Sequence, residues 1–170
     1  LNLHEEDRRV VKPARDAAEA AASIPGKGND GYFCGAALEL PDGTIVTGMN
    51  SPLFHAPASC ILNAIKKLAG LPPELLLLAP AVIDSVANLK RNMLKLSRVG
   101  LNVDETLIVL TVSSASNPTA NWAMEQLQKL HGCEMHISHM PNPGDETGLR
   151  KLGINLTSDP KFASRDLFIS

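Results

Sequence analysis

The chain has 170 residues, of which 44% are hydrophobic and 20% charged, which is ordinary for one globular domain with a sizeable core. Its formal net charge of −2 predicts no partner among nucleic acids or anionic membranes, and its longest apolar run, 75–82, is too short to span a bilayer. Three cysteines without a Cys-x-x-Cys pair fit the reduced thiols of a cytoplasmic protein.

The first thirty residues are predicted to form a helical segment. Residues 4–23 are rich in helix formers, and Pro13 within them predicts a kink or two short helices. Residues 24–31 contain the Gly, Pro and Asn residues that interrupt regular structure. We therefore divide the chain into an N-terminal helical segment, residues 1–30, and a single α/β domain, residues 31–170.

A β-hairpin is predicted at the start of that domain. Two β-capable runs, 32–40 and 44–48, flank the turn signal Pro-Asp-Gly. After a loop, a helix is predicted over 57–69, because Pro57 suits a first helical turn and Gly70 a helix end.

The second half of the chain is predicted to alternate helices and strands. The spacing of apolar residues predicts a helix over 80–97, and Asn117 and Pro118 begin another that runs to about His131. The continuous apolar run at 106–112 is typical of a strand buried on both faces. A strand over 134–139, a short helix over 144–153 and a last strand over 154–158 complete the series.

This order of elements predicts an α/β fold. Strands that alternate with helices imply parallel pairing, with helices on both faces of the sheet. We expect a three-layer α/β/α sandwich whose mixed sheet begins with an antiparallel hairpin. The order resembles the cytidine-deaminase-like fold, in which a hairpin precedes the first helix of the site; a shared fold says little about chemistry.

A zinc deaminase is not predicted from these residues. Such enzymes take three metal ligands and a catalytic glutamate from His-x-Glu or Cys-x-Glu at one helix start and Pro-Cys-x-x-Cys at a later one. Here His55 offers one ligand, but Pro57 replaces the glutamate, and Thr119 and Trp122 replace the two cysteines. We therefore predict no metal and no cofactor, and leave open whether the chain is an enzyme of another kind.

Three blocks of sequence resemble one bacterial family. They are "LPDGTIVTGMNSPLFHAPASCILNAIKKLAG", "SSASNPTANWAMEQLQKLHGCEMH" and "RKLGINLTSDP". They are similar to the C-terminal part of the family known as domain of unknown function number 1846, or uncharacterised protein family 0371. Its members are much longer, and an N-terminal region of theirs carries a Gly-rich stretch that looks like a phosphate-binding loop. The resemblance implies a C-terminal domain and no particular reaction, and a first residue other than Met suggests a chain whose beginning is missing.

Candidate ligand-binding residues follow from the predicted strand ends. Open α/β sheets bind ligands beyond the carboxyl ends of their strands, near helix N-termini. The loop after the hairpin carries Asn50, Ser51 and His55, and the loop after the predicted strand 106–112 carries Ser114 and Asn117. Such residues suit an anion or a ribose hydroxyl; the alternative is that they only cap helices.

Three more candidates are polar residues within predicted elements. Glu134 and His136 face the same side of their strand, where they form either an orienting acid–base pair or a structural one. His139 faces the other side, so these histidines do not predict a metal site. Asn63 lies in an apolar stretch of helix and needs a hydrogen-bond partner if it is buried.

Two functional hypotheses remain. The first is a non-catalytic or incompletely catalytic domain that supports a larger bacterial protein, either as a homo-oligomer or by docking on its N-terminal region. The second is a nucleotide- or phosphate-binding enzyme module whose site is shared with that region. Lys and Arg are interspersed with acids, which disfavours nucleic acid as the partner.

Overall fold

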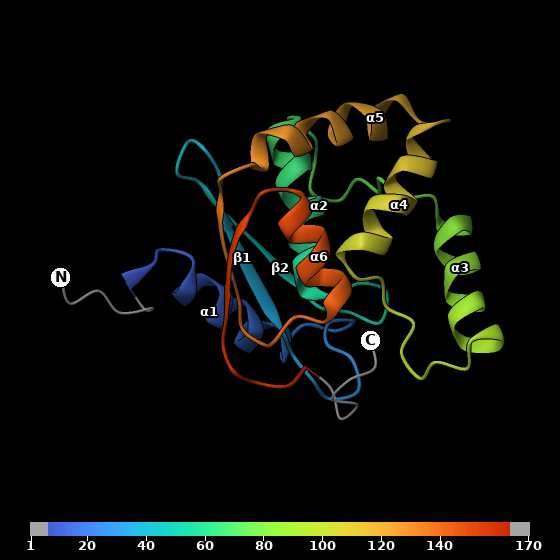
Figure 1. The fold of residues 1–170 in the computed structure, drawn as a ribbon, viewed down its shortest axis with the longest axis horizontal. Helices are drawn as coiled ribbons and strands as arrows, with labels where there is room; N and C mark the ends of the chain where they lie inside the picture. The colour runs from blue at the N-terminus through green and yellow to red at the C-terminus, as the bar shows by residue number, and fades with distance from the viewer. Residues whose placement is uncertain (1–6, 164–170) are drawn as a thin grey trace.

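The computed structural model describes residues 7–163 and shows a four-stranded sheet (Figure 1). The strand order is β2-β1-β3-β4. β1 (Gly35–Glu39) pairs antiparallel with both β2 (Ile45–Met49) and β3 (Glu134–Ile137), and β4 (Asn155–Ser158) runs parallel to β3. The predicted mixed α/β sheet that begins with an antiparallel hairpin is thus confirmed, whereas its likeness to the cytidine-deaminase-like fold stays a prediction.

Helices cover both faces of the sheet (Figure 1). α1 (Val11–Ala21) packs on one face and α2 (Ala56–Leu68) on the other. Because side chains alternate along a strand, Ala37 of β1 lies in the small apolar cluster beneath α1, and Leu38 lies in the large core beneath α2. This arrangement gives the three layers that the sequence predicts.

Two strand glycines allow these helices to approach the sheet closely. A Cβ atom on Gly35 would collide with the backbone of α1 at Ala14. A Cβ atom on Gly48 would collide with the backbone of α2 at Cys60. Each glycine therefore sets the distance between its strand and one helix.

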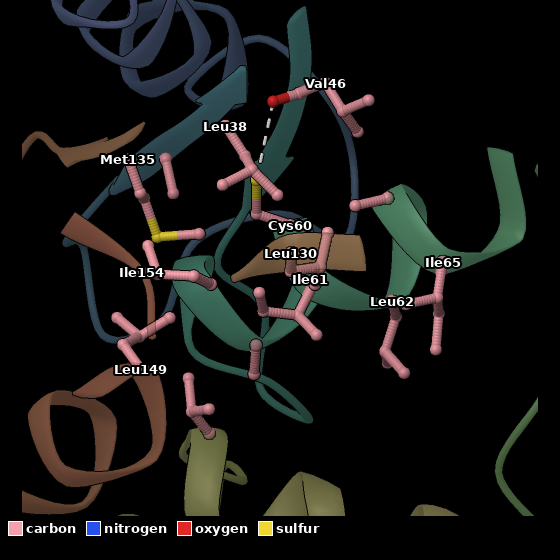
Figure 2. Close-up of a cluster of buried hydrophobic side chains, with 14 of the residues drawn as sticks. Leu38, Val46, Cys60, Ile61, Leu62, Ile65, Leu130, Met135, Leu149 and Ile154 are labelled. Atoms are coloured by element: carbon pink, nitrogen blue, oxygen red, sulfur yellow. Dashed lines mark hydrogen bonds between the residues drawn. The ribbon is translucent and has the colours of Figure 1, made fainter. Parts of the chain in front are cut away.

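The remaining helices lie on the α2 side of the sheet or beyond it (Figure 1). α4 and α5 pack against α2, α6 packs against α4 and β4, and α3 lies outside α4. Their bounds are α3 (Pro80–Asn88) with a π-helical turn at Leu89–Met93, α4 (Val103–Ser114), α5 (Pro118–Glu125) with a 3₁₀ turn at Gln126–Leu130, and α6 (Pro143–Lys151). Figure 2 shows the main core, where Leu38 and Met135 of the sheet meet Ile61, Leu130 and Leu149. Within the described part of the chain, no helix combines the length and apolar character needed to cross a membrane.

The prediction of a strand at 106–112 is wrong, because these residues form the middle of α4. The helix begins with a capping box: the Asn102 side chain accepts a hydrogen bond from the Glu105 N–H (2.9 Å), and the Glu105 carboxylate accepts one from the Asn102 N–H (3.0 Å). A continuous apolar run fits a buried strand and a largely buried helix equally well, so composition alone misassigned it.

The predicted kink at Pro13 is also wrong for the described residues. α1 is one helix from Val11 to Ala21, and Pro13 is its third residue. The first four N–H groups of a helix have no partner within it, so a proline there removes no hydrogen bond. The beginning of the predicted segment, residues 4–6, lies outside the described residues.

Candidate functional site

Three helices begin together at one edge of the sheet. The carboxyl ends of β2, β3 and β4 lie at this edge, which we call the carboxyl edge. The residues that cap α2, α4 and α6 there are His55, Asn102 and Asn142. Helix N-termini carry partial positive charge, and ligands of open α/β sheets bind at this edge. It is therefore the first place to look for a site.

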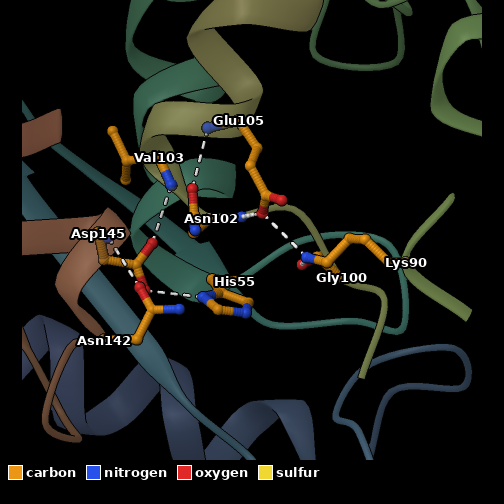
Figure 3. A network of polar contacts seen from close by, with 8 residues as sticks. All are labelled: His55, Lys90, Gly100, Asn102, Val103, Glu105, Asn142 and Asp145. Carbon is orange, nitrogen blue, oxygen red and sulfur yellow. Dashed lines mark hydrogen bonds and ion pairs between the residues drawn. The ribbon is translucent and has the colours of Figure 1, made fainter. Parts of the chain in front are cut away.

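His55 and Asp145 form a hydrogen-bonded pair at the carboxyl edge (Figure 3). His55 Nδ1 lies 2.7 Å from Asp145 Oδ2. The Asp145 side chain is only 4% exposed, and its other oxygen accepts a hydrogen bond from the Val103 N–H at 2.9 Å. The Asp145 N–H donates to the Asn142 side chain at 2.8 Å. The carboxylate is thus held from two helices.

This pair leaves one nitrogen of the imidazole available. A proton on Nδ1 that is donated to Asp145 places the lone pair of the neutral ring on Nε2. Among residues 7–163, no hydrogen bond or ion pair engages His55 Nε2, and the side chain is 26% exposed. A histidine oriented by a carboxylate in this way can exchange a proton or bind a polar ligand through Nε2.

The segment before α4 fixes His55 from the other side. The Leu101 N–H donates to the Leu53 carbonyl at 2.7 Å, and the His55 N–H donates to the Leu101 carbonyl at 2.9 Å. The buried Lys90 ammonium donates to the Gly100 carbonyl and to the Glu105 carboxylate, both at 2.9 Å (Figure 3). The Leu101 bonds tie the loop before α2 to the loop before α4, and the Lys90 bonds tie the turn after α3 to the start of α4.

Arg98 and Cys34 lie at the same edge. The Arg98 guanidinium lies 5.6 Å from the centre of the Tyr32 ring and 3.5 Å from a carboxylate oxygen of Asp30. Burial raises the pKa of the Cys34 thiol to about 12, while the charge of Arg98 opposes this rise and that of Asp145 adds to it. Cys34 is therefore a buried, protonated thiol between charged groups rather than a nucleophile.

The candidates near the hairpin have structural partners. The Asn50 side chain accepts a hydrogen bond from the Cys34 N–H at 2.8 Å and donates to the Tyr32 carbonyl at 3.0 Å. The Ser51 hydroxyl accepts from two N–H groups of the turn that follows, both at 3.2 Å. Asn63 donates to the Thr47 carbonyl at 3.0 Å, the partner that a polar residue in an apolar helix requires. Ligand binding by these three residues stays a prediction.

Ser51 and Asn63 also line a cavity of about 730 Å³ between α2, α3 and the loop that joins them. Most of its other lining residues are apolar, among them Leu62, Leu75 and Ile83. Lys66 lies on its wall, but the ammonium donates at 2.6 Å to the carbonyl of Pro73. The cavity is thus mainly apolar, with Lys27, Ser59 and Asp84 as further polar residues of its lining.

Ser114 and Asn117 lie at the opposite end of α4 from His55. The Ser114 hydroxyl donates to the Thr111 carbonyl at 2.7 Å. Asn117 caps α5, with its side-chain oxygen accepting from two N–H groups at 3.0 and 3.3 Å. Because 106–112 is a helix, it carries these residues away from the carboxyl edge, where a strand would have placed them.

Glu134 and His136 lie on the α1 face of the sheet rather than at the carboxyl edge. His136 is fully buried; its Nδ1 lies 2.7 Å from the Thr157 hydroxyl and its Nε2 3.2 Å from Asp159. Glu134 pairs with Arg8, which precedes α1. The structure gives both residues contacts that hold α1 to the sheet.

The structure therefore gathers only Asn50, Ser51 and His55 of the predicted residues at the carboxyl edge. Sequence reasoning missed Arg98 and Asp145 there. Two sequence patterns mark the helix starts that meet at Asp145. Asn-x-x-Glu at 102–105 is typical of the start of a helix, here α4, and Asn-Pro-Gly-Asp at 142–145 begins the helix that follows β3. No group of three metal-ligating side chains converges within residues 7–163.

A second notable feature is the outer surface of α4. Ile108 and Val112 are 65% and 51% exposed, one helical turn apart. Val109 and Leu110, on the inner side of the same helix, are buried in the core. We call the outer surface, formed by Ile108, Thr111, Val112 and Ala115, the α4 face.

Comparisons with known proteins agree on one family. The family model described as "Domain of unknown function DUF1846, C-terminal" matches residues 6–168. A UPF0371 protein of Clostridium botulinum (strain Langeland) is 42% identical over 169 residues, which are 99% of this chain and 33% of the relative. A UPF0371 protein of Clostridioides difficile (strain 630) is 41% identical over 170 residues, which are 100% of this chain and 34% of the relative. The chain thus spans about a third of the length of the curated relatives it matches.

Proposed function

The chain belongs to the DUF1846 family as its C-terminal domain, and we propose that this domain supports a larger protein by docking on the N-terminal region. The α4 face carries the proposal. Ile108 and Val112 expose large apolar side chains on a helix whose inner side is already in the core.

The composition of α4 favours a covering partner. Ile108 and Val112 lie on the side of α4 opposite its buried residues, where a surface helix usually carries polar side chains. Burial of a side chain such as Ile or Val contributes about 1.5–3 kcal/mol, so both together stabilise a docked arrangement substantially. Thr111 and Ala115 lie beside them, and their small side chains permit close approach of another segment.

The N-terminal region is the occupant that the relatives favour. Roughly two thirds of each relative lies outside the part that matches this chain. A covalently attached region is present at high effective concentration, so a small apolar contact suffices to hold it. A second copy of the domain is the competing occupant.

Calorimetry of the full-length protein tests this proposal. We expect the wild-type protein to unfold in one transition, and Ile108→Asp/Val112→Asp to separate it into two, since charges on the α4 face oppose docking. Leu76→Asp, which alters an equally exposed leucine in the loop before α3, is the matched control and should leave one transition. One unchanged transition in the double variant would contradict the proposal. The proposal would also be contradicted if the double variant lost a homo-oligomer of the wild-type protein but still unfolded in one transition, because a second copy would then cover the α4 face.

A further inference from the structure

We infer that Arg98 and His55, with Asp145 as the positioning residue of His55, form a binding site for a small oxyanionic ligand, a phosphate or carboxylate group, at the carboxyl edge. The inference is independent of the docking proposal, because none of its three residues belongs to the α4 face.

Arg98 is the principal cation of this site. Its side chain is only 13% exposed, yet within residues 7–163 its guanidinium makes no hydrogen bond. Its polar partner is the carboxylate of Asp30 at 3.5 Å, and that side chain is 67% exposed. A guanidinium has five donors in a planar fork, and the ion pair with Asp30 leaves donors of this fork open to a ligand. An oxyanion would satisfy two of these donors at once.

The Tyr32 ring holds the guanidinium in place. The central carbon of the guanidinium lies over the ring, 5.6 Å from its centre, which is a cation–π contact. The contact to an exposed aspartate is the kind that solvent and salt weaken, so an incoming anion displaces it at little cost.

His55 supplies the second contact. Its Nδ1 is fixed by Asp145 at 2.7 Å, so the ring presents Nε2 away from the carboxylate. A protonated His55 would donate from Nε2 to a ligand oxygen, with Asp145 compensating the charge of the ring. The same nitrogen in its neutral form accepts a hydrogen bond from a ligand hydroxyl.

The chain places Arg98 and His55 on adjacent segments. Residues 98–101 run along residues 52–55 through the hydrogen bonds at Leu101, and a Cβ atom on Gly100 would lie 3.6 Å from Cδ2 of the His55 ring. Arg98 and Asp145 are both near enough to the Cys34 thiol to shift its pKa, Arg98 downward and Asp145 upward. The N-terminus of α2, which has no acidic residue in its first turn, adds positive potential there, whereas Asp104, Glu105, Asp145 and Glu146 offset that of α4 and α6.

Another cluster of charged groups does not compete for this role. His136, Asp159 and Arg15 are engaged with one another beneath α1, at 3.2 Å and 2.8 Å, and His136 has no exposed surface. A ligand could reach that cluster only if α1 moved away from the sheet.

The test measures protection of His55 in the full-length protein. Diethyl pyrocarbonate modifies accessible imidazole nitrogens, and mass spectrometry resolves each histidine. We expect inorganic phosphate or acetate to slow modification of His55 at least fivefold, while His131, at the far end of the sheet, is unaffected. Protection by phosphate alone identifies a phosphate ligand, and protection by acetate alone a carboxylate ligand; both results support the site.

Variants test what Arg98 and Asp145 each contribute to the site. Arg98→Gln should raise the anion concentration needed for half-maximal protection of His55 at least tenfold. Arg98→Lys, which keeps the charge without the fork, should raise that concentration less. Arg150→Gln, on the exposed side of α6, is the matched control and should change nothing. Asp145→Asn should slow modification of His55 even without ligand, and Asp145→Glu should restore part of it, provided that far-ultraviolet circular dichroism shows a folded protein.

The site is refuted if neither anion protects His55 in the wild-type protein. It is also refuted if the anions protect His55 as well in Arg98→Gln as in the wild-type protein. Neither outcome changes whether this domain and the N-terminal region unfold in one calorimetric transition. Failure of the anion site and failure of the docking proposal are therefore distinguishable.

Discussion

Arg15 of α1 binds Asp159 through two hydrogen bonds, from Nε at 2.9 Å and from Nη2 at 2.8 Å. Asp159 follows β4 and also lies 3.2 Å from His136, so this contact joins α1, β3 and the end of β4. A carboxylate that receives a forked guanidinium is among the stronger polar contacts in proteins. It explains how α1 stays attached over a sheet face that carries few large apolar residues.

This contact predicts a pH dependence of stability. Arg15 foremost, with a smaller contribution from His136, holds the pKa of Asp159 below its ordinary value. A carboxyl group whose pKa is lower in the folded state stabilises the fold above its unfolded pKa of about 3.9, and that contribution disappears as the pH falls through the folded pKa. We expect urea denaturation of Asp159→Asn to show less loss of stability between pH 5 and pH 2 than wild type. An unchanged slope would mean that other carboxyl groups dominate acid unfolding.

Gly48 of the hairpin and Gly100 of the loop before α4 predict different effects of adding one methyl group. Gly48→Ala places a Cβ against the backbone of Cys60, which cannot move without shifting α2. Overpacking of this kind costs about 1–3 kcal/mol of the free energy of unfolding. Gly100→Ala is the control, since its Cβ would meet its nearest atom at 3.4 Å and its φ is ordinary. Chemical denaturation should separate the two variants; equal losses would show that α2 can retreat from β2.

The capping box of α4 predicts a measurable loss when it is broken. Asn102→Ala removes the acceptor for the Glu105 N–H, and the loss expected for such a cap is about 1 kcal/mol. Asn121→Ala removes an exposed contact to Glu125 at 3.3 Å and should change stability by less than about 0.5 kcal/mol. If both variants denature at the same urea concentration, the box does not stabilise the helix start.

Local signals predicted much of the fold. The hairpin is a short-range structure whose turn sequence specifies the pairing of β1 with β2, and Pro57 and Gly70 located α2 to within one residue. The short helix predicted over 144–153 likewise corresponds to α6. The prediction for 106–112 was wrong because a continuous apolar run shows neither the periodicity of a strand nor that of a helix. The capping box that marks the start of the helix, Asn102 with Glu105, lies before this run.

The candidate site was predictable only in part. His55 follows from its place before a helix that leaves the hairpin. Its partner Asp145 lies 90 residues further along the chain, and no local pattern expresses their contact. His136 and Asp159 likewise meet only because β3 and β4 are paired in parallel, so their structural role required the sheet register.

The buried ammonium of Lys90 holds both the segment beside His55 and the first turn of α4. It donates to the Gly100 carbonyl and the Glu105 carboxylate at 2.9 Å. Lys90→Met keeps the apolar stem but leaves the Gly100 carbonyl without a partner and the Glu105 carboxylate with only the Asn102 N–H, and we expect a loss of about 3 kcal/mol of the free energy of unfolding. Lys151→Met is the control, since Lys151 is exposed and lies 3.6 Å from Asp104, a type of pair worth about 0–1 kcal/mol. Hydrogen exchange at residues 98–101 should accelerate in Lys90→Met and not in the control. If those amides exchange as in wild type, the Leu101 hydrogen bonds alone suffice to hold the loop against His55.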